Sequence, residues 1–330
     1  MSAGALHLNA DSNQGLRPVD LRRDLSSIAA LMELCFGDTL DYSGRGAVRE
    51  MESLSRTGPL LWLLGSVAPN WQLGFVWIED VKVVGNVSTQ AAEFDRRAWL
   101  IANVAVHPDH RRKGIATALT DAAMRLAESS GARRVLLQVH RHNTGAHDLY
   151  RALGFHDVAT RTTWERTGRR EPLDFSLPGI EIRPSRRDDW QNEFAFVREL
   201  RPAGFSWLKP LDENDWRPSF WRSLRSLADF FIGNDSRRWI ALDDSTGALA
   251  GAFVIETGYA SADHLAFVIH PQWSGRLDRP LLASALRRLG HRPWTVRIDH
   301  PADDEPAEAA LKEFGFQPMQ TLVWMQKEIS

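Results

Sequence analysis

A basic turn between two apolar stretches is the part of the sequence best suited to chemistry. It reads His107-Pro-Asp-His-Arg-Arg-Lys-Gly114, and it follows the apolar run 100–106. That run predicts a strand buried on both faces. Residues 115–128 then carry apolar residues at the i, i+3, i+4 spacing of an amphipathic helix. A strand, a turn with glycine and a helix N-terminus together predict an anion site, because the first N–H groups of a helix have no partner within it.

Three side chains and one glycine indicate which anion this is. Arg111, Arg112 and Lys113 surround the turn with positive charge, and the arginine fork suits phosphate oxygens. Gly114 lets the backbone approach a ligand closely, because glycine has no Cβ atom. The sequence therefore predicts a phosphate or pyrophosphate ligand at the turn.

Length and composition place the chain among ordinary globular proteins. Its 330 residues exceed the usual size of one domain, so two domains are expected. The 40 basic and 42 acidic residues nearly balance, which gives no support to nucleic acid or a membrane surface as a partner. No apolar run reaches the roughly 18 residues of a membrane span, and residues 1–14 lack the pattern of a signal peptide. A cytoplasmic location is expected.

A single cysteine limits the chemistry further. Cys35 cannot form an internal disulfide or a multi-cysteine zinc site. Its apolar neighbours at helical spacing favour a core position over a role as nucleophile. The pair His140 and His142 stands at a predicted strand end without a third ligand, so no metal is assigned.

The rest of the sequence alternates short strand and helix patterns. The predicted elements are a helix over 24–36, strands over 60–64, 73–78, 135–139 and 158–164, and a helix over 144–153 that Gly154 ends. The polar stretch 80–97 is predicted to connect strands or to extend them, and 37–58 to form a helix and loops. Residues 1–14 are predicted to be a loose tail.

The second half of the sequence repeats features of the first half in the same order. The echoed pairs are Leu16-Arg-Pro18 with Ile182-Arg-Pro184, His107-Pro108 with His270-Pro271, and Tyr150…Gly154-Phe155 with Leu311…Gly315-Phe316. The spacing is kept as well, because His107 and Gly154 lie 47 residues apart and His270 and Gly315 lie 45 apart. Two copies of one domain are therefore predicted, joined by a charged linker with prolines over 166–179.

Two motifs within this repeat resemble those of the GNAT superfamily of acyl-CoA-dependent N-acyltransferases. Arg111-x-x-Gly114-x-Ala116 matches the family's Q/R-x-x-G-x-G/A phosphate loop. Asn143-x-x-Ala146-x-x-Leu149-Tyr150-x-x-Leu153-Gly154-Phe155 matches the family's pattern after the fifth strand. The clear match covers residues 98–160, and residues 15–97 fit only in the order of their elements.

The resemblance implies a fold, a cofactor and a set of binding residues. Each domain is expected to be an α/β fold with a mixed, mainly antiparallel sheet, flanked by helices and splayed between its fourth and fifth strands. Acetyl-CoA is the implied co-substrate, with its pantetheine arm along the exposed edge of the fourth strand. The implied cofactor-binding residues are Asn103, Val104, Ala105, Val106, Arg111, Arg112, Lys113, Gly114, Ile115, Ala116, Thr117, Asn143 and Ala146.

The reaction implied by the resemblance is direct attack of a neutral amine on the acetyl thioester. Tyr150 stands where the family keeps the general acid for the CoA thiolate, although its helical spacing also suits a core tyrosine. Asn143 suits pantetheine binding and helix capping equally. No general base is assigned, because Leu100 holds the place of the glutamate that some members carry, and Glu79 and Asp80 are better explained as loop carboxylates.

The second copy lacks the residues that carry the resemblance. Aligned on its His-Pro pair it has Ser274, Leu277 and Arg279 at the places of Arg111, Gly114 and Ala116, and aligned on Gly315 it has Leu311 at the place of Tyr150. Residues 15–165 are therefore predicted to be a catalytic domain, and residues 180–330 a degenerate GNAT-like domain.

The predicted function is transfer of an acetyl or short acyl group to a primary amine of a small molecule or peptide, by a monomer or homodimer. A non-catalytic acyl-CoA sensor with the same cofactor loop stays open as the alternative. A P-loop nucleotide-binding protein is disfavoured, because the sequence has no G-x-x-x-x-G-K-[ST] motif.

Overall fold

The computed structural model describes residues 14–37, 74–92, 95–168, 174–202, 211–217, 235–257, 262–290 and 295–329. Within the chain, contacts define two compact units. We call Met1–Asp157 with Met325–Ser330 unit 1, and Val158–Trp324 unit 2. The predicted strand over 60–64, residues 38–58 of the region 37–58 and residues 1–13 of the tail lie outside the described residues.

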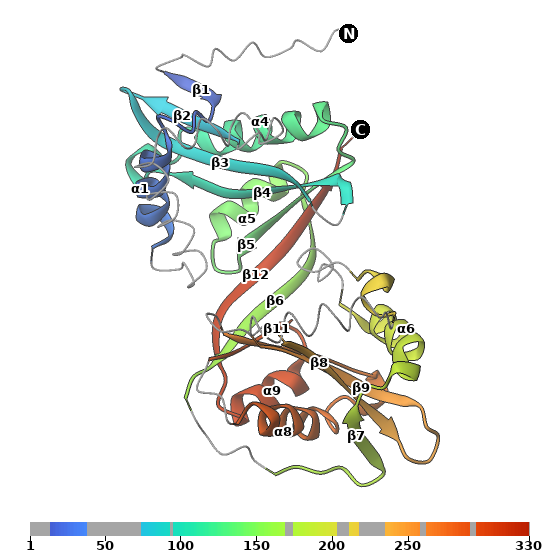
Figure 1. Cartoon of the computed structure of the whole chain (residues 1–330). Helices are drawn as coiled ribbons and strands as arrows, with labels where there is room; N and C mark the ends of the chain where they lie inside the picture. Colours follow the sequence, from blue (N-terminus) through green and yellow to red (C-terminus); the bar gives the residue numbers. More distant parts are fainter. Residues whose placement is uncertain are drawn as a thin grey trace. The chain divides into compact units, whose positions relative to one another are not determined.

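The sheet of unit 1 follows the chain order through its first five strands (Figure 1). These are β1 (Gly15–Pro18), β2 (Phe75–Glu79), β3 (Lys82–Ala92), β4 (Asp95–Val106) and β5 (Arg134–His140). The first four strands pair antiparallel, and β5 pairs parallel with β4. The stretch 80–97, predicted to connect strands or to extend them, is mostly strand, since β3 and the start of β4 form a long hairpin in which polar residues such as Asn86 and Thr89 are buried.

Helices cover both faces of this sheet. Val76 and Ala105 both lie beside Asn86 in the register, and they pack with helix α1 (Leu25–Phe36) in one core cluster. The next residue of β3, Gly85, points to the opposite face because strand residues alternate. There it faces Ile115 and Leu119 of helix α4 (Ile115–Ser129). The predicted helices over 24–36 and 115–128 are thus confirmed, as is the one over 144–153, which forms α5 (Thr144–Ala152).

Gly85 sets how closely the start of α4 approaches the sheet. A Cβ atom placed there would lie 2.9 Å from Ile115 Cγ2 and 2.9 Å from Leu119 Cδ1. Gly85→Val is therefore expected to lower the free energy of unfolding by about 1–3 kcal/mol, the usual cost of overpacking. Urea denaturation measures this, with Gly145→Ala as the control, because a Cβ at Gly145 meets nothing within 4 Å. Equal stability of the two variants would show that α4 does not rest on Gly85.

The predicted split between the fourth and fifth strands is present. β4 pairs with β5 only from Ala98 to Leu100, opposite Arg134 to Leu136. β4 continues to Val106 and β5 to His140 without further pairing. Among the described residues, nothing pairs with this edge of the last six residues of β4, which is therefore available to an extended ligand.

Unit 2 repeats this architecture, which confirms the predicted duplication of the fold. Strands β7 (Ile180–Pro184), β8 (Asp235–Asp243), β9 (Leu249–Thr257) and β10 (Asp263–Ile269) pair antiparallel, and β11 (Val296–Pro301) pairs parallel with β10 over only two residues. Helices α6 (Trp190–Leu200), α8 (Asp278–Leu289) and α9 (Glu305–Glu313) follow the order of α1, α4 and α5. Gly251 lies under Leu277 and Leu281, as Gly85 lies under Ile115 and Leu119.

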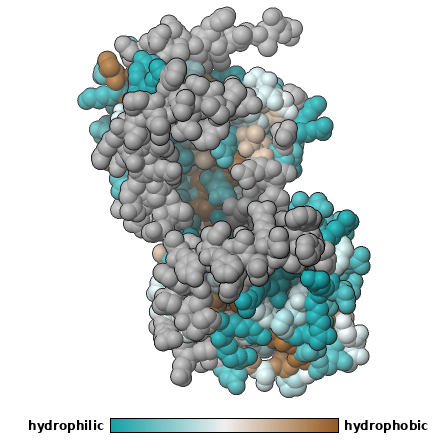
Figure 2. All heavy atoms as spheres, in the orientation of Figure 1, coloured by the Kyte–Doolittle hydropathy of each residue, from teal (hydrophilic) through white to brown (hydrophobic). Residues whose placement is uncertain are grey.

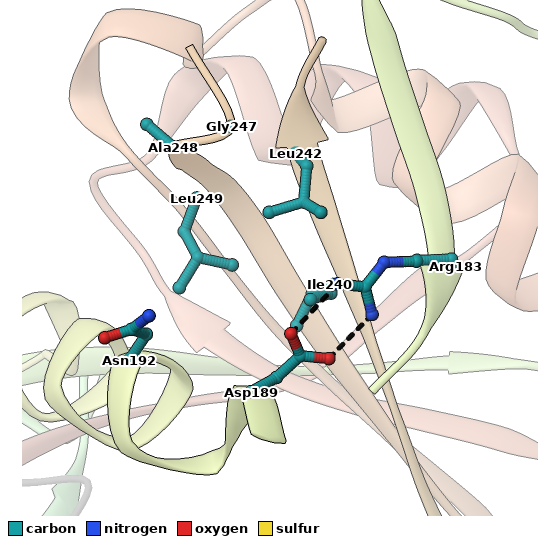
Figure 3. Close-up of a pocket in the computed structure, with 8 residues that line it drawn as sticks. All are labelled: Arg183, Asp189, Asn192, Ile240, Leu242, Gly247, Ala248 and Leu249. Atoms are coloured by element: carbon teal, nitrogen blue, oxygen red, sulfur yellow. Dashed lines mark hydrogen bonds and ion pairs between the residues drawn. The ribbon is translucent and has the colours of Figure 1, made fainter. Parts of the chain in front are cut away.

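An ion pair at the start of each unit is repeated too. Arg17 donates two hydrogen bonds to Asp24, of 2.6 and 2.7 Å, and Arg183 donates two to Asp189, of 2.6 and 2.9 Å (Figure 3). Each pair fixes a short strand to the beginning of the following helix. Beside the pair of unit 2 lies a pocket of about 270 Å³, lined by the polar side chains of Arg183, Asp189 and Asn192 and by residues of β8, of β9 and of the turn between them.

Two strands belong partly to both units. β6 (His156–Arg166) begins in unit 1 and continues in unit 2, where it pairs with β11. β12 (Gln317–Glu328) runs through unit 2 beside β6 and ends in unit 1. There Lys327 donates to the Leu153 carbonyl at 2.7 Å, and the Ile329 N–H donates to the Arg133 carbonyl at 2.9 Å. The domain boundaries drawn from the sequence assign each of these strands to one domain, whereas contacts divide both.

The described surface carries few exposed apolar side chains. Figure 2 shows a mostly hydrophilic described surface on the face drawn, with small hydrophobic patches. Among the described residues the exposed large hydrophobic side chains are Leu34, Val81 and Met319, which are scattered along the chain and need no partner to explain them. No helix in the described part of the chain is long and apolar enough to cross a membrane.

Candidate functional site

The turn after β4 has a backbone conformation suited to an anion. A 3-10 turn over Pro108–His110 ends at the extended residue Arg111. Arg112 and Gly114 then have positive φ angles of 64° and 79°. Left-handed residues within a turn direct successive N–H groups toward one point, and such a concave arrangement binds anions. The strained φ of Arg112 is also the kind of outlier that is found at functional sites.

The N–H groups of this turn have no acceptor in the described part of the chain. Among the described residues, no group accepts a hydrogen bond from the backbone N–H of residues 112–117. The first backbone bond of α4 is from Ala118 to the Gly114 carbonyl, at 3.0 Å. Six consecutive donors at the positive end of a 15-residue helix form a site for a negatively charged group.

The strand edge that leads to this turn contains a bulge. Asn103 has a φ of 55°, and the register of β3 against β4 shifts at this point. Asn86 of β3 donates to the Asn103 carbonyl at 3.1 Å, and the Asn103 amide donates to Ser88 Oγ at 3.3 Å. Sequence reasoning missed Asn86, whose only signal is a polar residue within a strand that is otherwise rich in valine. These bonds hold the bulge on the free edge of β4.

The implied cofactor residues contribute in different ways. The side chains of Ala105 and Ile115 are buried in the core, so only their backbone groups are available to a ligand. Arg111, Arg112 and Lys113 are exposed. Arg111 folds back, and its Nε donates to the Val106 carbonyl at 3.2 Å.

A carboxylate at the end of β2 holds two residues of the turn. Glu79 Oε2 accepts a hydrogen bond of 2.6 Å from His110 Nδ1 and one of 3.3 Å from Lys113 Nζ. The Trp77 indole N–H donates to the other oxygen at 3.3 Å. The bond from His110, supported by Lys113, lowers the pKa of Glu79. Glu79 therefore lies against the anion turn as an ionised partner of its basic side chains.

Asn143 and Tyr150 lie at the N-cap and in the last turn of α5, the helix that follows β5. Asn143 Oδ1 accepts the Ala146 N–H at 3.2 Å, so this side chain caps α5. Tyr150 is 6% exposed, its ring packs edge-on against Phe155, and burial raises the pKa of its hydroxyl to about 12. Its hydroxyl has no hydrogen-bond partner among the described residues. At neutral pH the hydroxyl thus keeps its proton and can donate a hydrogen bond.

A histidine at the end of β5 also lacks a partner. The Nδ1 atom of His140 is buried without a hydrogen bond, and burial lowers the pKa of the ring, with His142 adding to the effect. The two rings lie 5.3 Å apart. No group of three side chains that could hold a metal ion occurs in the described ranges.

In the same turn of unit 2 the N–H groups of residues 275–277 all have acceptors. The Gly275 N–H donates to Asp278 Oδ2 at 2.6 Å, and the N–H groups of Arg276 and Leu277 donate to the Trp273 carbonyl at 3.1 and 2.9 Å. Strand β10 pairs with β9 without a register shift, so the bulge is missing as well. Fold alone therefore requires neither the open turn nor the bulge of unit 1.

Packing corrects one detail of the sequence alignment between the two units. Aligned on the His-Pro pairs, Leu277 falls on Gly114. In the structure Leu277 packs on Gly251 as Ile115 packs on Gly85, so the turn of unit 2 is one residue shorter. Leu311, aligned with Tyr150, is fully buried and has no polar group to offer.

Comparisons with known proteins agree with this geometry. Residues 47–155 match the model of the acetyltransferase (GNAT) family. The ribosomal protein bS18-alanine N-acetyltransferase of Escherichia coli (strain K12) is 33% identical over 78 residues, which are 23% of this chain and 53% of that protein. The chain thus spans about half the length of the curated relatives it matches.

Two solved structures extend the likeness of the fold over nearly the whole chain. A GCN5-related N-acetyltransferase from Sphaerobacter thermophilus is 17% identical, with 95% of each chain covered and a TM-score of 0.61. A tandem GNAT protein from the clavulanic acid biosynthesis pathway is also 17% identical, with 95% of this chain and 98% of that chain covered and a TM-score of 0.51. Residues 47–155 therefore match the model of the acetyltransferase (GNAT) family, and the chain as a whole shares its fold with a tandem GNAT protein.

Proposed function

We propose that this protein is an N-acyltransferase that moves an acetyl or short acyl group from acyl-CoA to a primary amine. The observation that supports this most is the row of N–H groups from 112 to 117, which have no acceptor among the described residues. The pyrophosphate of CoA brings the charge and the oxygens that such a row binds. In this proposal Arg111, Arg112 and Lys113 add positive charge around it.

The edge of β4 supports the proposed place of the thioester. The His107 N–H donates to the Val84 carbonyl of β3 at 2.8 Å. Because N–H groups alternate sides along a strand, the N–H of Val106 points toward the free edge. A pantetheine arm paired with that edge would bring its thioester carbonyl to such a donor, which stabilises the negative charge that develops on the oxygen.

The proposed reaction needs no covalent intermediate on the protein. A neutral amine attacks the thioester carbon, the new N–C bond forms, and the C–S bond breaks as the tetrahedral intermediate collapses. The amine loses one proton to solvent water, since no protein base is assigned, and the sulfur leaves as the CoA thiolate. Tyr150 is proposed to donate a hydrogen bond to that sulfur.

The acceptor amine is proposed from the curated relative. The name of that relative states that it acetylates an alanine of ribosomal protein bS18, so the α-amino group of a peptide that begins with alanine is the first acceptor to test. Polyamines, aminoglycosides and N-blocked peptides with lysine complete the panel.

Calorimetry and a CoA-release assay test the proposal together. We expect one acetyl-CoA to bind per chain and CoA to be released with at least one amine of the panel. Tight CoA binding without release of CoA for any amine would favour the non-catalytic sensor. Absence of CoA binding would overturn both readings.

A further inference from the structure

The turn of unit 2 keeps part of the conformation of the unit 1 turn, although it is one residue shorter and lacks the residues that suit phosphate. His270 opens a 3-10 turn at Pro271–Trp273, as His107 does in unit 1. Gly275 then has a φ of 79°, where Arg112 of unit 1 has 64°. A turn that gathers N–H groups around one point is costly to keep if nothing accepts from them.

The acceptor is a side chain of unit 2 itself. Asp278 is the first residue of α8, its residue exposure is 1%, and its Oδ2 lies 2.6 Å from the Gly275 nitrogen. A bond this short from an N–H to a buried carboxyl group is typical of charge-assisted pairing. A buried carboxylate is tolerated when backbone donors and the positive end of a helix compensate for lost water.

Asp278 stands where unit 1 has a small residue. Because Leu277 packs as Ile115 does, Asp278 corresponds to Ala116. The small side chain of Ala116 leaves space for a ligand next to the turn of unit 1. In unit 2 the side chain of Asp278 fills the corresponding space.

The positive side chains of this turn are turned to other partners. The Arg276 guanidinium lies 4.8 Å from the centre of the Trp273 ring, and Arg279 Nε donates to Glu313 Oε2 at 2.7 Å. Arg111 and Lys113 of unit 1 likewise have partners, the Val106 carbonyl and Glu79, so the difference between the two turns lies in their N–H groups. In unit 2 those of residues 275–277 are paired and are not available to an external phosphate.

The split between β10 and β11 is also filled. The rings of Phe267 on β10 and His300 on β11 stack 4.6 Å apart, and both residues are buried. His300 Nε2 bonds Asp304 Oδ2 at 2.8 Å, and Asp304 caps α9. A pantetheine arm would have to separate these two rings to follow the edge of β10.

From these contacts we infer that the Asp278 carboxylate occupies the anion-binding position of unit 2. The corresponding position of unit 1 is the one proposed to bind a phosphate group. Unit 2 is then a cofactor fold that is closed by its own side chains, and the chain takes up one acyl-CoA. The inference rests on the proposed function only in treating the turn of unit 1 as a phosphate seat.

The wild-type chain allows a direct test by amide hydrogen exchange, followed by NMR on the full-length ¹⁵N-labelled protein. Without ligand, we expect the Gly275 amide to exchange on the order of 100-fold more slowly than that of Arg112, because only the former has a buried acceptor. Inorganic pyrophosphate should slow exchange at Arg112 and leave Gly275 unchanged. Equally fast exchange at the two amides, or a response of Gly275 to pyrophosphate, would overturn the inference.

Asp278→Ala tests the same point by removing the internal anion. It gives unit 2 the residue that unit 1 has at this place, so the Gly275 amide signal should now shift on titration with pyrophosphate and reach saturation. Asp278→Asn keeps an acceptor oxygen and is expected to show no such shift. Leu282→Ala serves as a control for loss of stability, because Leu282 is a buried residue of the same helix outside the turn.

The outcomes separate this inference from the proposed function. A folded Asp278→Ala chain without a saturable shift at Gly275 would overturn the inference, whatever unit 1 binds. If Asp278→Ala does not fold, the exchange experiment on the wild-type chain still decides. Failure of acetyl-CoA to bind unit 1 would overturn the proposed function and leave the protection of Gly275 as a separate result.

Discussion

Gly114→Glu is expected to lower the affinity for acetyl-CoA by at least about 100-fold, which corresponds to about 2.8 kcal/mol. Gly114 has a φ of 79°, and a Cβ atom there would meet nothing within 4 Å. The new side chain therefore has room, and it occupies the space in which the phosphate is proposed to lie. Its carboxylate would also repel the phosphate and compete with it for the free N–H groups. Isothermal titration calorimetry with CoA measures the change.

Backbone strain has to be separated from loss of the site. A residue other than glycine at a positive φ costs roughly 1–2 kcal/mol, and this alone lowers stability. Gly131 is the matched control, because it has a φ of 82° with nothing within 4 Å and follows the other end of α4. Gly131→Glu should lose similar stability and bind CoA like the wild-type protein. If Gly114→Glu binds CoA equally well, the assignment of the anion site is wrong.

Tyr150→Phe is expected to lower kcat by about 100-fold and to change the affinity for CoA by no more than about twofold. Burial raises the pKa of Tyr150 to about 12, so its hydroxyl is protonated at any pH at which the enzyme is assayed. Complete proton transfer to a thiolate whose pKa is about 8.5 would be uphill by about 5 kcal/mol. The expected role is therefore a hydrogen bond to the leaving sulfur, and burial of the thiolate makes that bond stronger.

The same variant has a built-in control for structure. Phenylalanine keeps the ring, whose centre lies 6.0 Å from that of Phe155, so the melting temperature should change by no more than a few degrees. Single-turnover and steady-state rates with the best amine of the panel measure the effect. An unchanged kcat would leave Tyr150 as a core residue, which its helical spacing also allows.

The parts of the site that depend on local sequence were predictable. The turn and the N-terminus of α4 follow from a glycine, a basic run and helical spacing within about twenty residues, and the capping role of Asn143 was one of two readings of its position. The split of β4 from β5 came from the family resemblance and is confirmed.

The parts that depend on distant contacts were not predictable. The positive φ of Asn103 arises from the register between β3 and β4, which a single strand pattern does not contain. The correspondence of Asp278 with Ala116 was not predictable, because the sequence repeat aligns the two units only at the His-Pro pair. That the turn of unit 2 is one residue shorter follows only from the packing of Leu277 on Gly251. The roles of the implied cofactor residues stay predictions until a ligand is bound.

The return of β12 to unit 1 has a consequence for the order in which the protein is made. The ribosome produces residues 1–157 first, yet unit 1 also contains residues 325–330, which emerge only after all of unit 2. Bonds from Lys327 and Ile329 to the carbonyls of Leu153 and Arg133 therefore form last during synthesis. Unit 1, which carries the anion site, is therefore incomplete until unit 2 has been translated. A nascent chain that stops before β12 leaves one edge of β5 unpaired, and an unpaired strand edge is prone to association with other chains.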